Sequence, residues 1–212
     1  MRQIGIVLAG GASRRMGVDK LSLPLSSESK TTILEHVVDC VSKITEDVYI
    51  AHAPTPSLTV EQLTERIGDH VHFLQDETWY NGPLGVLARL SISLPKSDLV
   101  YIVAGDLPGL NSNVLKACGD ILLGNGKKRD AALVERDGKL QPLLGCYQPH
   151  ALSTFFDEWK NGETRLMPVL AKLKIEPVVS EKAMWPAWWT KPVHTPEDYA
   201  SWESEWRRYH AT

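Results

Sequence analysis

The sequence has only three cysteines, no apolar run long enough to cross a membrane and no excess of basic charge. Cys40, Cys118 and Cys146 are odd in number and far apart, which argues against a disulfide framework and a paired-cysteine metal site. A formal net charge of −3 gives no indication of a nucleic-acid partner. The apolar run at residues 4–9 is too short for a secretion signal. These absences predict a cytoplasmic protein without a membrane or nucleic-acid partner.

Apolar runs and helical periodicities alternate along the chain. Near-continuous apolar runs at residues 4–9 and 99–104 predict strands buried on both faces, and shorter strands are expected at residues 48–51 and 71–74. Thr31 or Thr32 is expected to cap the first helix. Apolar residues at helical spacing predict helices over residues 32–43, 59–67, 84–94, 113–122, 152–159 and 165–172.

The whole pattern predicts one α/β domain over residues 1–212. The composition, 43% hydrophobic and 23% charged, is that of a soluble globular protein. Alternating strands and helices are typical of a doubly wound, mostly parallel sheet with helices on both faces. An Asp137-Gly138 turn within residues 131–147 adds a small antiparallel hairpin. Ligands of such sheets bind beyond the carboxyl ends of the strands, which is where chemistry is expected.

The loop after the first strand combines glycines with basic residues. Gly10 and Gly11 allow the backbone to turn and to approach a ligand closely. Arg14, Arg15 and Lys20 place three cations in the same loop, and a triphosphate requires such compensation. The loop is not a Walker A motif, because no Ser or Thr follows the lysine. We interpret it as a triphosphate-binding loop.

Two further segments carry candidate site residues. Asp106 directly follows the strand at residues 99–104, and a lone carboxylate there can hold Mg²⁺ against substrate phosphates. Gly82 and Pro83 introduce a helix start, whose N–H groups favour anions or base edges. Asp76 lies just upstream and can accept a hydrogen bond from a base or ribose. We therefore expect nucleotide contacts from these segments.

Together these segments resemble the molybdenum cofactor guanylyltransferases, a branch of a wider nucleotidyltransferase superfamily. The run LAGGASRRMGVDK at residues 8–20 is similar to the family's LAGGxSxRMGxDK signature, and Gly82-Pro83-Leu84 to the GPL segment of the guanylyl branch. Residues 105–108 resemble the family's metal-site motif. Weaker matches are Gln141-Pro142, Thr164-Arg165-Leu166 and residues 193–198.

The resemblance implies a Rossmann-like fold, GTP as donor, Mg²⁺ as cofactor and the phosphate of molybdopterin as acceptor, with pyrophosphate as the leaving group. It implies metal binding by Asp106 and stabilisation of the departing pyrophosphate by Arg15 and Lys20. A molybdoenzyme or a cofactor-delivery protein is an expected partner. The nucleotide contacts it implies are Leu8, Ala9, Gly10, Gly11, Lys20, Asp76, Gly82, Pro83, Leu84 and Asp106.

The chain departs from the family pattern near its end. The family usually has Asn at two positions occupied here by Pro192 and His194, and imidazole is a poor ligand for Mg²⁺. Val86 replaces a glycine of the family's GPLxG segment. Three alternatives stay open: a cytidylyltransferase, a sugar-phosphate nucleotidyltransferase and a non-catalytic nucleotide-binding homologue. The tryptophans within residues 185–206 predict a packed lid or edge helix, or else a partner surface or pterin-stacking wall.

Overall fold

The computed structural model describes residues 1–10, 20–52, 68–75, 82–124 and 128–210, without the side chains of Lys20 and His210. The helix predicted at residues 59–67 lies outside the described residues. Within the described part of the chain, no helix is both long and apolar enough to cross a membrane.

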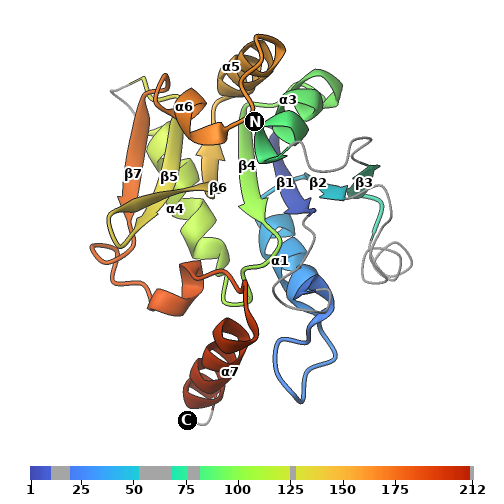
Figure 1. Cartoon of the computed structure of the whole chain (residues 1–212), viewed down its shortest axis with the longest axis vertical. Coiled ribbons are helices and arrows are strands. Elements are labelled where there is room, and N and C mark those ends of the chain that lie inside the picture. The colour runs from blue at the N-terminus through green and yellow to red at the C-terminus, as the bar shows by residue number, and fades with distance from the viewer. Residues whose placement is uncertain (11–19, 53–67, 76–81, 125–127, 211–212) are drawn as a thin grey trace.

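One seven-stranded sheet organises the molecule (Figure 1). The strand order is β3-β2-β1-β4-β6-β5-β7, and only β6 runs antiparallel to its neighbours β4 and β5. This confirms the predicted mostly parallel α/β sheet with an antiparallel excursion. The strands are β1 (Gln3–Ala9), β2 (Asp47–His52), β3 (Val71–Gln75), β4 (Leu99–Ala104), β5 (Ala131–Arg136), β6 (Lys139–Tyr147) and β7 (Ile175–Val179).

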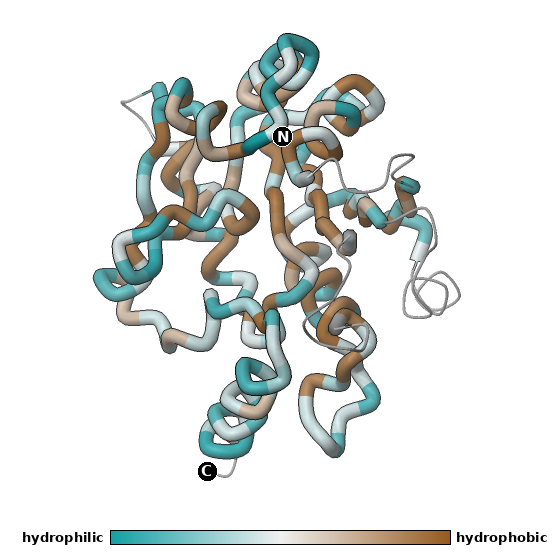
Figure 2. The backbone as a smooth tube through the Cα atoms, viewed as in Figure 1, coloured by the Kyte–Doolittle hydropathy of each residue, from teal (hydrophilic) through white to brown (hydrophobic). Residues whose placement is uncertain are grey.

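Helices cover both faces of the sheet and bury two hydrophobic cores. One core packs α1 and α4 against the sheet, and the other packs α3, α5 and α6 against the opposite face. Figure 2 shows the hydrophobic central strands from which both cores are built. The helices are α1 (Ile33–Ser42), α3 (Gly82–Ser93), α4 (Ser112–Leu123), α5 (Pro149–Lys160), α6 (Leu166–Leu170) and α7 (Pro196–His210), with short 3-10 helices η1 (Lys20–Ser22) and η2 (Ala187–Thr190).

The predicted cap of the first helix and the predicted hairpin turn are both confirmed. Thr32 caps α1, because its hydroxyl accepts a hydrogen bond from the Glu35 N–H while the Glu35 carboxylate accepts one from the Thr32 N–H. This capping box resolves the choice between Thr31 and Thr32. Asp137 and Gly138 both have positive φ, 50° and 69°, as a tight antiparallel turn requires.

Two elements differ from the sequence prediction. The helix predicted at residues 165–172 is the shorter α6, and Arg165 stands at its N-cap without a side-chain capping bond. The strand β7 was not predicted, because its five residues include Glu176 and Pro177 and lack a clear apolar alternation. Pro177 is tolerated because β7 pairs only with β5 and forms an edge of the sheet.

An aromatic cluster holds the C-terminal helix against the rest of the chain. Trp202 is only 4% exposed, and its indole N–H donates to the Leu25 carbonyl at 2.8 Å. The Tyr199 hydroxyl donates to the Pro24 carbonyl at 2.6 Å. Trp188 packs against Trp202 with ring centroids 5.5 Å apart. The predicted packing of an aromatic edge helix is therefore confirmed, and Figure 1 shows α7 beyond the carboxyl end of β4.

Candidate nucleotide and metal site

The carboxyl ends of β1 and β4 bring two predicted motifs to the same edge of the sheet. The strands are parallel neighbours with Leu8 opposite Ala104, so Ala9 and Gly10 lie beside the segment that holds Asp106. The Gly105 N–H donates to the Leu8 carbonyl at 3.0 Å and extends this pairing by one residue. Two sequence motifs that lie far apart in the chain thus converge at the predicted place.

Gly105 and Gly10 keep the backbone at this edge compact and accessible. A Cβ atom on Gly105 would lie 3.1 Å from the Leu8 carbonyl oxygen and 3.2 Å from a methyl of Leu34, so a larger residue would crowd the strand ends. Among the described residues, a Cβ atom on Gly10 would meet nothing within 4 Å. The described part of the chain therefore leaves room for a ligand to approach the main chain at Gly10.

Asp106 is a buried residue at the carboxyl edge of the sheet, just after the end of β4. The residue is only 6% exposed. Its Oδ2 atom lies 3.3 Å from Nδ1 of His194, whose side chain is half exposed. The Asp106 carbonyl accepts a hydrogen bond from the Val193 N–H at 2.9 Å. The C-terminal segment consequently returns to the strand end and places an imidazole beside the carboxylate.

The start of α7 fixes this returning segment. Asp198 accepts hydrogen bonds from the N–H groups of His194, at 3.1 Å, and Thr195, at 3.0 Å. The Thr195 hydroxyl accepts one from the Asp198 N–H at 3.2 Å. Burial alone would raise the pKa of the Asp198 carboxyl, but these backbone hydrogen bonds outweigh it and hold the pKa below its usual value. Asp198 is therefore an ionised anchor for the backbone of His194.

Gly109 allows the segment before His194 to lie close to the loop that follows β4. A Cβ atom on Gly109 would collide with the Trp188 carbonyl oxygen and with its indole ring. The Arg136 guanidinium donates to the Thr190 carbonyl at 2.5 Å and fixes the far end of η2. Sequence reasoning missed Gly109, because an isolated glycine carries no signal for a partner so distant in the chain.

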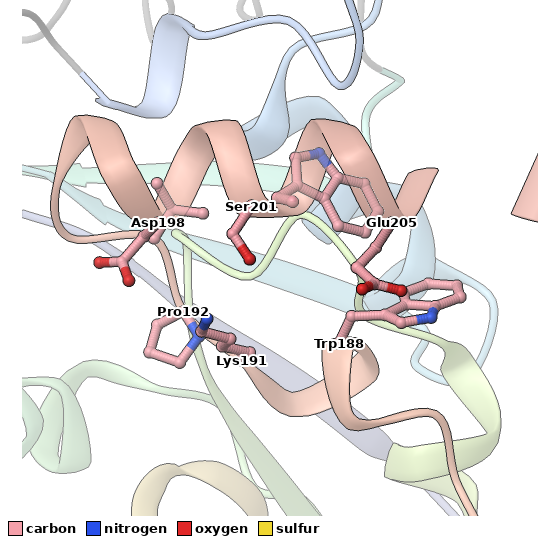
Figure 3. A pocket seen from close by; sticks show the side chains of 8 residues that line it. Trp188, Lys191, Pro192, Asp198, Ser201 and Glu205 are labelled. Carbon is pink, nitrogen blue, oxygen red and sulfur yellow. The ribbon is translucent and has the colours of Figure 1, made fainter. Parts of the chain in front are cut away.

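A shallow hollow, open to solvent, lies between this segment and α7. Figure 3 shows Trp188 and Pro192 on one side of it and Ser201 and Glu205 on the helix opposite. Trp202 also lines the hollow, but its ring is buried in the aromatic cluster and presents no open face for stacking. The cluster therefore serves packing, and the stacking interpretation finds no support in Trp202.

The remaining predicted residues fall into three groups. Gly82 has a φ of 69° at the start of α3, and a Cβ atom there would lie 3.6 Å from the Thr164 carbonyl oxygen, which brings two of the family-like segments together. Pro83 is exposed in the first turn, whereas the Leu84 side chain is fully buried, so only its main chain can face a ligand. The predicted positions outside the described residues are Gly11, Arg14, Arg15 and Asp76.

Lys20 belongs to the same side of the domain as Asp106. Its backbone begins η1, and the next residue, Leu21, is buried with a methyl 3.4 Å from the Cβ position of Gly105. The main chain at Lys20 is therefore close to the strand end that carries Asp106. Contact between the Lys20 ammonium and a triphosphate stays a prediction.

The fold places the chain in the class of nucleotidyltransferase domains. The family model of the MobA-like NTP transferase domain matches residues 5–183. The chain belongs to this family.

Three similar proteins illustrate the relationship. A probable molybdenum cofactor guanylyltransferase of Mycobacterium ulcerans is 33% identical over 150 residues, which are 68% of this chain and 67% of that protein. Another from Bacillus cereus is 27% identical over 199 residues, 92% of each chain. The crystal structure of molybdopterin-guanine dinucleotide biosynthesis protein A from Archaeoglobus fulgidus superposes with a TM-score of 0.73 at 19% identity, covering 97% of this chain and 99% of that one.

Proposed function

We propose that this protein is a guanylyltransferase that transfers GMP from GTP to the phosphate of molybdopterin and releases pyrophosphate. The observation that carries the proposal is the buried carboxylate of Asp106 beside the open backbone at Gly10, at the carboxyl ends of adjacent parallel strands. Membership of the family and the names of the relatives support the choice of reaction and acceptor. The Gly82-Pro83-Leu84 segment supports GTP over CTP as the donor.

The donor atoms at this edge fit a divalent cation. A carboxylate oxygen is a preferred ligand of Mg²⁺, which takes one or two protein carboxylates together with phosphate oxygens and water. Asp106 supplies that oxygen at a position that is largely screened from solvent. A cation bound there would neutralise charge on the triphosphate and align it for attack.

The chain's own groups bind and orient the reactants. The main chain at Gly10 and the start of α3 bind the nucleotide, while Arg15 and Lys20 pair with the β- and γ-phosphates. An oxygen of the acceptor phosphate attacks the α-phosphorus, a new P–O bond forms, and the bond to the β-phosphate oxygen breaks. Because the acceptor is already an anion, no general base is required. Positioning and charge compensation therefore supply most of the rate enhancement.

Pyrophosphate release with each of the four nucleoside triphosphates tests the proposal. We expect release with GTP that depends on added molybdopterin and on a divalent cation. Preference for CTP would instead favour the cytidylyl alternative, and tight GTP binding without turnover would favour a non-catalytic homologue.

The substitution Asp106→Asn tests the assignment of the metal ligand. It keeps the shape of the buried side chain while removing its charge, so we expect turnover to fall by about 10²–10³-fold with little change in melting temperature. The matched control is Asp130→Asn, which changes a mostly buried carboxylate at the opposite edge of the sheet. Equal activity of the Asp106 variant and the natural protein would refute the assignment.

A further inference from the structure

An imidazole shares the candidate cation site with the carboxylate of Asp106. Nδ1 of His194 lies 3.3 Å from Oδ2 of Asp106. Backbone hydrogen bonds hold both residues in place. The Asp106 carbonyl is bonded to the Val193 N–H, and the His194 N–H is bonded to Asp198. These bonds hold the main chains of both residues at the same point on the carboxyl edge.

Two other His–Asp pairs in the described part of the chain serve as internal comparisons. In the first, Asp47 contacts His72 at 3.1 Å but also binds the Arg2 guanidinium at 2.7 Å. In the second, Asp130 contacts His150 and also accepts the Lys174 N–H at 2.7 Å. Both aspartates lie at the amino edge, at or just before the start of a strand.

The separation of the two donor atoms fits a shared ion. Two ligand atoms bound to one ion at about 2.1 Å lie about 3.0 Å apart at a right angle and about 3.4 Å apart at a tetrahedral angle. The observed 3.3 Å between His194 Nδ1 and Asp106 Oδ2 falls within this interval. The half-exposed imidazole and the carboxylate therefore need no large rearrangement to bind the same cation.

We propose that His194 is a second ligand of the cation at Asp106 and that it shifts the preference of the site from Mg²⁺ to divalent cations of the first transition series. Imidazole nitrogen binds Co²⁺, Zn²⁺ and similar ions well and binds Mg²⁺ poorly. A carboxylate alone would leave the site to hard, oxygen-seeking cations. This inference rests on the proposed function, because the nucleotide phosphates complete the coordination of the ion.

The substitution His194→Asn tests the proposal directly. Asn replaces the nitrogen donor by an amide oxygen, and the backbone N–H that binds Asp198 is retained, so the anchor of the segment is preserved. We expect the affinity ratio of Co²⁺ to Mg²⁺, measured by the visible absorption of bound Co²⁺ in competition, to fall by tenfold or more. The control His150→Asn changes a comparable exposed imidazole at the amino edge and should leave the ratio unchanged.

Pulsed electron paramagnetic resonance of bound Mn²⁺ provides a readout that is independent of activity. We expect a ¹⁴N coupling from imidazole in the natural protein and in the His150 variant, and its loss in His194→Asn, with Mn²⁺ alone and with Mn²⁺ plus GTP. Absence of this coupling in the natural protein, or an unchanged Co²⁺ to Mg²⁺ ratio in the variant, would overturn the proposal. The proposed function fails separately, if no cation supports pyrophosphate release from GTP.

Discussion

The two edges of the sheet carry similar His–Asp pairs but connect them to the fold in different ways. At the amino edge, Asp130 binds His150 with its Oδ1 atom and the Lys174 N–H with its Oδ2 atom. The Asp130 N–H also donates to the Lys174 carbonyl, and the Asp130 carbonyl accepts a hydrogen bond from the Gln148 N–H. The pair therefore joins the beginnings of β5, β7 and α5.

At the carboxyl edge, the corresponding pair joins a strand end to a returning loop. The Asp106 carbonyl accepts a hydrogen bond from the Val193 N–H, and the Asp106 carboxylate faces His194. The loop is fixed in turn by Asp198 and by the Trp188 packing on Gly109. The same residue pair therefore holds structural elements together where neighbouring strands start, and we propose that it binds a ligand where parallel strands end.

Trp202 is an exception to this division between the two edges, because it lies on the carboxyl side and yet stabilises the fold. Its indole is buried and bonded to the Leu25 carbonyl. We expect Trp202→Ala to lower the free energy of unfolding by about 3–5 kcal/mol in chemical denaturation. The loosened segment around His194 should also lower turnover by roughly tenfold or more, since small displacements of a site are costly.

Trp206→Ala supplies the matched control for this prediction. Trp206 packs against Trp202 in a tilted arrangement, with ring centroids 5.3 Å apart, but is only partly buried. Its truncation should cost less stability and leave turnover close to normal. If the two variants lost equal stability, the buried position of Trp202 would not be the source of the effect.

Much of this architecture was predictable from the sequence, because its signals are local. The apolar runs of β1 and β4, the capping box at Thr32 and the Asp137-Gly138 turn each depend on a few adjacent residues. The topology rule then places Asp106 at the carboxyl edge of the sheet. Edge strand β7 was missed, since its stability comes from pairing with β5 rather than from its own pattern.

The composition of the site was harder to predict than its location. The sequence motif identified Asp106, and His194 stood out only as an unexpected residue in a family-like segment. Their proximity depends on the Val193 hydrogen bond and on the packing of Trp188 against Gly109, which join distant parts of the chain. Contacts of this kind are tertiary, so no local pattern encodes them.

Asp130→Asn should lower stability without lowering activity, because Asp130 belongs to the structural pair at the amino edge. Burial alone would raise the pKa of Asp130, but the Lys174 N–H and His150 hold it below its usual value of 3.8. A carboxyl whose pKa is lowered on folding stabilises the protein above about pH 3.8, and this contribution is lost as the pH falls through the folded-state pKa.

We therefore expect Asp130→Asn to cost about 1–3 kcal/mol at neutral pH, with a loss that shrinks as the pH falls below 3.8 and through the folded-state pKa. Urea unfolding of the natural and variant proteins across this pH range measures the difference. A constant loss at every pH would contradict the role of the ionised carboxylate.

The smallest expected effect comes from Thr32, which lies near the carboxyl edge of the sheet but is not a predicted site residue. It caps α1, the helix that follows β1. In the described part of the chain, its hydroxyl binds only the first turn of that helix, within the capping box. Thr32→Ala should cost about 1 kcal/mol of unfolding free energy and leave GTP turnover unchanged. Thr31→Ala, one residue earlier and exposed, should change neither. A fall in turnover with Thr32→Ala would mean that the carboxyl edge is sensitive to helix stability in general. The amino and carboxyl edges would then differ in rigidity rather than in the chemistry of their His–Asp pairs.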